Sequence, residues 1–122
     1  MNNQVSWLLA VAVKPGKIDS FRTLMEEMVA STRAEPGALG YEWFVSDDDR
    51  AVHLYERYTD SSAALAHLGA FGAKFAGQFL DLADPTALAV LGTPSEEAKA
   101  ALSGFDPVYL RPFGGFVRES VA

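Results

Sequence analysis

Three side chains near the middle of the chain, Glu56, Tyr58 and His67, could together carry out proton transfer. Glu56 and Tyr58 end a segment that is rich in aromatic and β-branched residues and is typical of a strand. His67 follows in a segment that opens with Thr59-Asp60-Ser61, as capped helices do. An imidazole titrates near neutral pH, so His67 could act as a general base. Glu56 could orient His67 or bind a phenolic hydroxyl directly, and Tyr58 could donate a hydrogen bond.

Other side chains could bind the molecule on which such a base acts. Trp43, Phe71 and Phe75 could stack on an aromatic ring. Tyr41 could donate a hydrogen bond to a developing anion, and Arg111 could reach over a cavity to hold an enolate or phenolate. Oxygenation without a cofactor needs this combination of an apolar cavity, a base and a donor. It also needs a substrate that gives an electron to oxygen once it is deprotonated.

The same residues also fit purely structural roles. His67 could simply pack or form a hydrogen bond, and Glu56 could pair with Arg57, Arg111 or a residue of a partner chain. Aromatic residues at helical spacing favour a buried core position, and these are Phe71, Phe75 and Phe79. The three consecutive carboxylates at 47–49 cannot converge on one ion, so they indicate a solvated turn, and we expect no metal site.

Length and composition predict one globular domain that spans residues 1–122. Of the 122 residues, 49% are hydrophobic and 21% are charged, which is ordinary for a folded domain. The net charge of −6 disfavours nucleic acid and anionic membranes as partners. The chain has no cysteine, no apolar run of membrane-spanning length and no basic start before an apolar stretch. We therefore expect a cytoplasmic protein without disulfides.

The periodicity of apolar residues predicts alternating strands and helices. The expected elements are a strand at 5–13, a helix at 18–33, a hairpin at 37–45 and 51–58, a helix from 59 to about 81, a strand at 86–91, a helix at 94–102 and a last strand at 105–117. Glycines predict a bend of the second helix between Gly69 and Gly72. Thr93-Pro94-Ser95-Glu96 matches a capping box with proline at the first helical position. Pro107 and Pro112 confine the last strand to an edge or to an inter-subunit position.

This order, β-α-β-β-α-β with an extra short helix and a C-terminal strand, predicts an α+β fold of the ferredoxin-like, split βαβ type. Its antiparallel sheet carries helices on one face only. The other face would be apolar whichever alternate residues point to it, since Trp7 or Leu8 and Trp43 or Phe44 must lie there. We therefore expect a homodimer that associates through the sheets.

Two segments resemble the antibiotic biosynthesis monooxygenase family: 36–42, Pro-Gly-Ala-Leu-Gly-Tyr-Glu, and 54–67, which runs from Leu54 to His67. The resemblance extends from about residue 5 to residue 91. It implies a dimeric α/β barrel and, for some members, oxidation of quinols or polycyclic aromatic compounds by molecular oxygen with no cofactor. Glu56 matches the family's strand carboxylate and His67 matches its helix histidine, while Tyr58 stands where many members have tryptophan.

Departures from the family pattern narrow the expected activity. Haem-degrading relatives need an asparagine on the first strand together with tryptophan and histidine, and this chain lacks the first two at the matching places, so haem degradation is disfavoured. Two hypotheses remain. The first is a cofactor-independent monooxygenase acting on a small quinol-like or polyphenolic substrate. The second is a non-catalytic dimeric module of the same fold that binds a small ligand or serves structurally.

Overall fold

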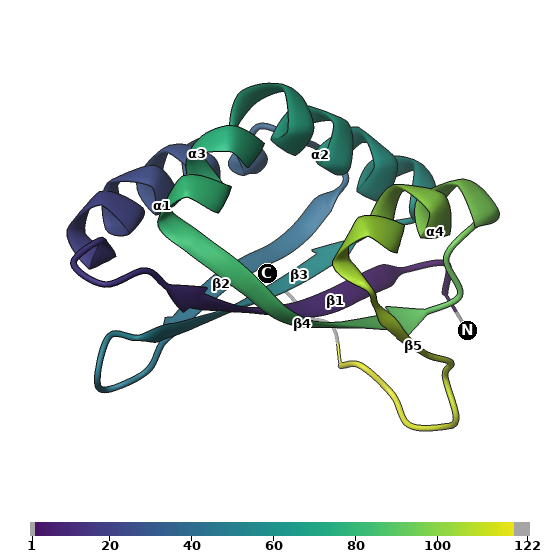
Figure 1. Cartoon of the computed structure of the whole chain (residues 1–122). Coiled ribbons are helices and arrows are strands. Elements are labelled where there is room, and N and C mark those ends of the chain that lie inside the picture. The colour runs from purple at the N-terminus through teal and green to yellow at the C-terminus, as the bar shows by residue number, and fades with distance from the viewer. Residues whose placement is uncertain (1, 119–122) are drawn as a thin grey trace.

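A curved sheet with all the helices packed on one of its faces makes up the body of the protein (Figure 1), seen in a computed structural model that describes residues 2–118. The strand order is β2-β3-β1-β4-β5, antiparallel except for the β4–β5 pair. The elements are β1 (Val5–Val13), α1 (Ile18–Arg33), β2 (Ala38–Val45), β3 (Ala51–Tyr58), α2 (Ser61–Lys74), α3 (Ala76–Leu82), β4 (Ala83–Gly92), α4 (Glu96–Leu102) and β5 (Val108–Leu110). The predicted α+β, ferredoxin-like fold is confirmed.

The central strand β1 decides which side of the sheet is the core. Its odd-numbered residues Val5, Trp7, Leu9 and Val11 are buried beneath the helices. Because side chains alternate along a strand, Leu8 points to the opposite face, where it is exposed. β1 is paired on both sides, with β3 and with β4, so the core is built around it.

The first helix forms where the sequence predicts it, from Ile18 to Arg33. Its residues Phe21, Leu24, Met28 and Thr32 recur at helical spacing and are buried against the sheet. The hairpin of β2 and β3 follows as predicted, joined by a turn in which the Asp48 carboxylate accepts hydrogen bonds from the Ser46 hydroxyl and the Arg50 backbone N–H.

The predicted bend between Gly69 and Gly72 is wrong. Helix α2 continues through both glycines, and the break falls at Phe75, which lies between α2 and α3. The break allows α3 to turn its Phe79 into the core, where the ring packs on Phe21 and Phe71. Gly69 and Gly72 therefore do not interrupt α2, although each costs a helix interior about 1 kcal/mol relative to alanine.

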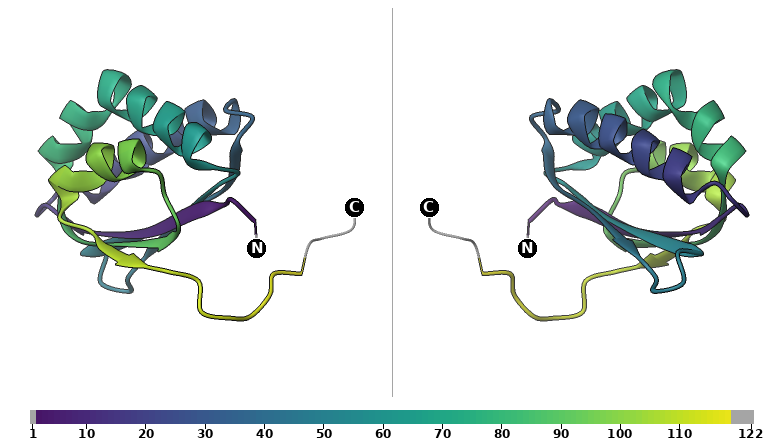
Figure 2. Two further views of the ribbon diagram at one scale, coloured as in Figure 1. Left: turned by 90° about the vertical axis from the view of Figure 1, so that its right-hand side faces the viewer. Right: turned by 90° about the vertical axis from the view of Figure 1, so that its left-hand side faces the viewer.

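The C-terminal part differs from the prediction in two boundaries. Helix α4 begins at Glu96 and not at Pro94, because Ser95 is the N-cap, and its hydroxyl accepts a hydrogen bond from the Ala98 N–H. The last strand has only three residues, Val108–Leu110, because Pro107 and Pro112 flank it. Its edge position is as predicted. Figure 2 shows the chain after β5 running below the sheet, away from the helices.

The face of the sheet opposite the helices is open and apolar at its centre. Leu8 and Phe44 are 43% and 55% exposed there. The segment after β5 adds Phe113 and Phe116, which contact little of the described chain and are largely exposed. None of the helices between residues 2 and 118 is long and apolar enough to cross a membrane.

The packing at the break between α2 and α3 makes a prediction about stability. Phe79→Ala removes a fully buried ring between aromatic neighbours, so it should lower the free energy of unfolding by about 3–5 kcal/mol. Urea denaturation measures this loss. Leu80→Ala is the matched control because Leu80 is next in the helix and is exposed, so its substitution should change stability little. Equal losses in the two variants would contradict the assigned packing.

Candidate functional site

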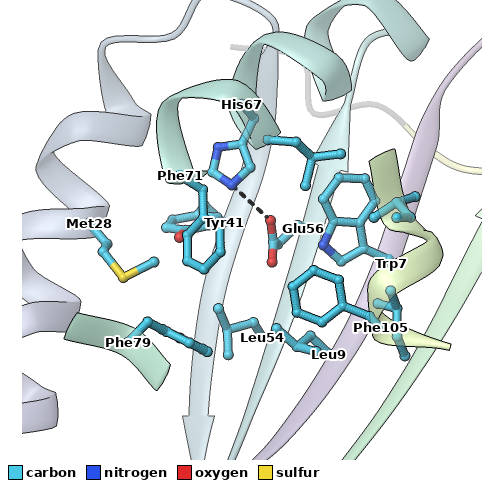
Figure 3. A pocket seen from close by; sticks show the side chains of 13 residues that line it. Trp7, Leu9, Met28, Tyr41, Leu54, Glu56, His67, Phe71, Phe79 and Phe105 are labelled. Carbon is cyan, nitrogen blue, oxygen red and sulfur yellow. Dashed lines mark ion pairs between the residues drawn. The ribbon is translucent and has the colours of Figure 1, made fainter. Parts of the chain in front are cut away.

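A small cavity lies between the inner face of the sheet and the helices (Figure 3). Most of its wall is apolar or aromatic, and Glu56 and His67 provide its charged and titratable groups. The lining residues are Trp7, Leu9, Met28, Tyr41, Leu54, Glu56, His67, Leu68, Phe71, Phe79, Leu88, Leu102 and Phe105. Its volume of about 30 Å³ is enough for one or two water molecules. The site therefore combines a mostly apolar wall with a single carboxylate, that of Glu56.

Glu56 projects from β3 into this cavity. Its side chain is buried, and its Oε1 accepts a 2.7 Å hydrogen bond from the hydroxyl of Tyr58, which points to the same face of the strand. The Nε2 atom of His67 lies 3.2 Å from the same oxygen. Figure 3 shows the second carboxylate oxygen directed into the cavity toward Leu54. One oxygen of Glu56 is thus held by the protein and the other is available to a bound molecule.

His67 reaches Glu56 because of how α2 begins. Asp60 is the N-cap, and its carboxylate accepts a hydrogen bond from the Ala63 N–H. From that start, Ala64 and His67 lie on the helix face that is buried against the sheet. The His67 ring packs on Tyr58 with the ring centroids 5.0 Å apart, and on Tyr41 at 5.4 Å. The orientation of the imidazole is therefore fixed by contacts on both strands of the hairpin.

The second nitrogen of His67 faces a residue that sequence reasoning missed, Glu35. Nδ1 lies 3.1 Å and 3.3 Å from the two carboxylate oxygens of Glu35. Helix α1 ends at Arg33, as predicted, and Glu35, which follows its C-cap Ala34, completes the site with its carboxylate. No local pattern could have identified it, because its partner is 32 residues away in the chain.

A close backbone approach brings Glu35 to the histidine. A Cβ atom placed on Gly37 would lie 2.4 Å from the Cβ of Ala63, so only glycine allows this turn to press against α2. Ala63 is one helical turn before His67. The Thr59 N–H also donates to the Gly37 carbonyl at 2.9 Å and ties the turn to the end of β3.

Burial and charge change the pKa values of the titratable side chains in the site. Burial alone would lower the pKa of His67, but the hydrogen bond and the charge of Glu56, followed by those of Glu35, raise it above its ordinary value. The pKa values of Tyr58 and Tyr41 are raised well above their usual range, first by burial and then by the charge of Glu56. Both phenols therefore remain protonated and can donate hydrogen bonds at neutral pH.

The structure brings four of the eight predicted site residues to the cavity wall: Tyr41, Glu56, His67 and Phe71. Tyr58 does not line the cavity, but its hydroxyl donates a hydrogen bond to Glu56, which does. Trp43 and Phe75 pack against the core instead of lining this cavity, and Arg111 is exposed beyond β5.

Three aromatic side chains that sequence reasoning did not assign to the site also line the cavity: Trp7 from β1, Phe79 from α3 and Phe105 from the turn after α4. In the sequence, only the alternation of side chains along β1 indicated that Trp7 could face the helices. Among residues 2–118, no three His, Asp or Glu side chains are placed to hold one metal ion. Glu35 and Glu56 bind opposite edges of the His67 ring, which keeps their carboxylates apart.

Comparison with known proteins agrees with this fold. The family model described as antibiotic biosynthesis monooxygenase matches residues 7–77, more than half of the chain. Rv0793 of Mycobacterium tuberculosis, which is named as a proposed monooxygenase, is 30% identical over 69 residues, which cover 57% of this chain and 68% of Rv0793. The solved structure of Rv0793 has a TM-score of 0.66 and covers 76% of this chain and 97% of its own, at 28% identity.

Two further solved structures share the fold at lower identity. MupZ from Pseudomonas fluorescens has a TM-score of 0.86 and 22% identity and covers 97% of this chain and 91% of its own. SnoaB from Streptomyces nogalater, described as a cofactor-independent oxygenase, has a TM-score of 0.66 and 17% identity and covers 76% of this chain and 95% of its own. The extent of the MupZ match indicates that the elements after β4 belong to a fold that also occurs elsewhere.

The raised pKa of His67 makes a prediction about stability and pH. A basic group whose pKa is higher in the folded state stabilises that state fully below its unfolded pKa, about 6.5, and this contribution is lost as the pH rises through the folded pKa. The wild type should therefore exceed His67→Gln in free energy of unfolding by more at pH 6 than at pH 9. Urea denaturation at both pH values measures the two differences. Equal differences at the two pH values would contradict the assigned ion pairs of His67.

Proposed function

Because this chain belongs to the antibiotic biosynthesis monooxygenase family, we propose that it is a cofactor-independent monooxygenase. Its substrate would be a small quinol-like or polyphenolic molecule, oxidised by molecular oxygen. One observation carries the proposal: a buried carboxylate, Glu56, has one oxygen held by Tyr58 and His67 and the other directed into an aromatic cavity. The similarity to Rv0793 supports the same class of reaction.

The proposed reaction starts with removal of a proton from the substrate by Glu56. The resulting anion gives one electron to dioxygen, and the substrate radical and superoxide then combine to form a carbon–oxygen bond. Glu56 returns its proton to the distal part of the peroxide and removes a second proton from the same carbon. The O–O bond breaks, hydroxide leaves with that proton as water, and a carbonyl remains. In sum, one hydroxyl and one ring C–H of the substrate react with O₂ to give two C=O groups and H₂O, with all four electrons supplied by the substrate.

In this proposal, the base is Glu56 and not His67. Both ring nitrogens of His67 face carboxylates, so neither is free to approach a substrate. His67 instead supplies the positive charge that keeps Glu56 ionised in an apolar wall. Tyr41 lines the cavity with a protonated hydroxyl and could donate a hydrogen bond to the substrate anion.

The small size of the cavity favours a second candidate function, a non-catalytic module of the same fold that serves structurally or binds only a very small ligand. The volume of about 30 Å³ is far below the roughly 300–1,000 Å³ of typical small-molecule sites. An aromatic substrate would have to displace part of the wall. Phe105 is the wall residue that lies in a short 3₁₀ turn and not in a regular helix or strand, so it is the side chain best placed to move.

Oxygen uptake with Glu56→Gln tests the monooxygenase proposal. The purified protein should consume oxygen with quinols or hydroxyanthracenes when neither flavin nor metal is added, and the loss of the base should slow turnover by about 10²–10⁴-fold. Glu42→Gln is the matched control, because Glu42 lies on the neighbouring strand but is exposed.

Two results would contradict the monooxygenase. One is equal turnover in wild type and Glu56→Gln. The other is no turnover with any member of the panel, together with thermal stabilisation by the same compounds that both variants retain, which would favour the non-catalytic module.

We also propose that a second copy of the chain covers the open face of the sheet. The face has Leu8 at its centre, and Phe44 is half exposed on the same side. The chain after β5 runs below this face and adds Phe113 and Phe116, so the apolar surface continues onto that segment (Figure 2). An exposed apolar surface of this extent is typical of an interface, and a like surface on a second copy would match it.

Light scattering after size exclusion tests this association. The wild type should have the mass of two chains, and Leu8→Lys should have the mass of one, because it places a charge in the centre of the face. Leu80→Lys, which alters an equally exposed leucine on the helical side, should remain dimeric. A monomeric wild type would contradict the proposal.

A further inference from the structure

We propose that Glu35 is a positioning residue that holds His67 in its doubly protonated form and thereby keeps Glu56 ionised and directed into the cavity. This inference rests on the proposed function, in which Glu56 is the base. Glu35 itself does not line the cavity and would not touch the substrate.

The hydrogen-bond inventory of imidazole carries the first step. A neutral imidazole has one N–H donor and one bare nitrogen, whereas an imidazolium has two donors. In this site each ring nitrogen faces a carboxylate: Nδ1 lies 3.1 Å from Glu35 and Nε2 lies 3.2 Å from Glu56. An ionised carboxylate can only accept hydrogen bonds, so when Glu35 and Glu56 are both ionised each ring nitrogen must carry a proton to satisfy both contacts.

No other negatively charged group among the described contacts of the His67 ring could stabilise its second proton. The groups that face His67 are Glu35 from the turn after α1, Glu56 and Tyr58 from β3, Tyr41 from β2 and Trp7 from β1. None of these is a cation. Within residues 2–118, both Glu35 and Glu56 form their ion pairs with His67. Without Glu35, the ring would keep one carboxylate partner and would lose much of the reason to hold a second proton.

The charge state of Glu56 depends on that second proton. The Glu56 side chain is only 5% exposed and lies in an apolar wall, where burial favours the neutral acid. The Tyr58 hydroxyl and an imidazolium on Oε1 oppose this effect by stabilising the carboxylate. A neutral His67 could instead accept a hydrogen bond from a protonated Glu56, and a protonated Glu56 cannot act as a base.

Glu35 differs from His67 and Glu56 in its contact with water. Its side chain is 21% exposed, so water still solvates it, while the side chains of His67 and Glu56 are nearly buried. The turn that carries it is pressed against α2 at Gly37 and Ala63. Glu35 thus places a solvated negative charge against the outer edge of the ring, and His67 transmits its effect to the cavity.

The test is a pH titration of His67 in wild type and in Glu35→Gln. NMR signals of the imidazole nitrogens and protons monitor the titration. Glutamine keeps the shape and removes the charge, so the His67 midpoint should move to lower pH by about one unit or more. The chain has two histidines, and His53→Gln identifies which signals belong to His67. Glu26→Gln, on the exposed side of α1, should leave the His67 titration unchanged.

A second variant and a kinetic measurement complete the test. Glu35→Asp keeps the negative charge but moves it away from the ring, because aspartate is one methylene group shorter. Its His67 midpoint should therefore lie between those of wild type and Glu35→Gln. With an active substrate, kcat of Glu35→Gln should fall by about 10- to 100-fold with little change in KM. An unchanged His67 midpoint in folded Glu35→Gln would overturn the inference. Absence of turnover in the wild type would instead overturn the proposed function, while the titration would still decide the role of Glu35.

Discussion

The arrangement of this protein depends on the cost of holding an ionised carboxylate in an apolar wall. Removing Glu56 from water is expensive unless hydrogen bonds and an opposite charge compensate for the lost solvation. The protein provides both on a single oxygen, through the hydroxyl of Tyr58 and the ring of His67. The second oxygen is left for the cavity. A row of groups, Glu35, His67, Glu56 and Tyr58, is therefore ordered by the requirement that a buried charge has hydrogen-bond partners and an opposite charge nearby.

The scaffold places these groups with few degrees of freedom. Trp7 on β1 is paired in register with Glu56 on β3, and Glu56 is paired in register with Tyr41 on β2, so the residues beneath the helices form a row across three strands. The helix α2 then lays His67 over that row, at a depth set by the contact of Gly37 with Ala63. Rigid strand pairing below and a close backbone contact above are what hold the imidazole within hydrogen-bond distance of two carboxylates.

The alternation of side chains along the strands separates two tasks. The face beneath the helices carries the cavity and the row of polar groups, and the opposite face carries Leu8 and Phe44 in the open. Because the two sets share the same strands, a change of register by one residue would exchange them. The proposed chemistry and the proposed association therefore use opposite faces of one sheet. Each depends on the same hydrogen-bonded register, so neither could shift without the other.

The sequence by itself determined most of the fold and part of the site. Periodicity predicted β1 and the first helix at their observed bounds, and the resemblance on 54–67 pointed to Glu56 and His67, because these signals are local in the chain. The break at Phe75 and the contribution of Glu35 were decided only by tertiary structure. Phe79 turns inward because of aromatic neighbours on other elements, and Glu35 meets a histidine 32 residues away. Contacts of this kind have no periodic signature, since they depend on how separate elements pack and not on the pattern within any one of them.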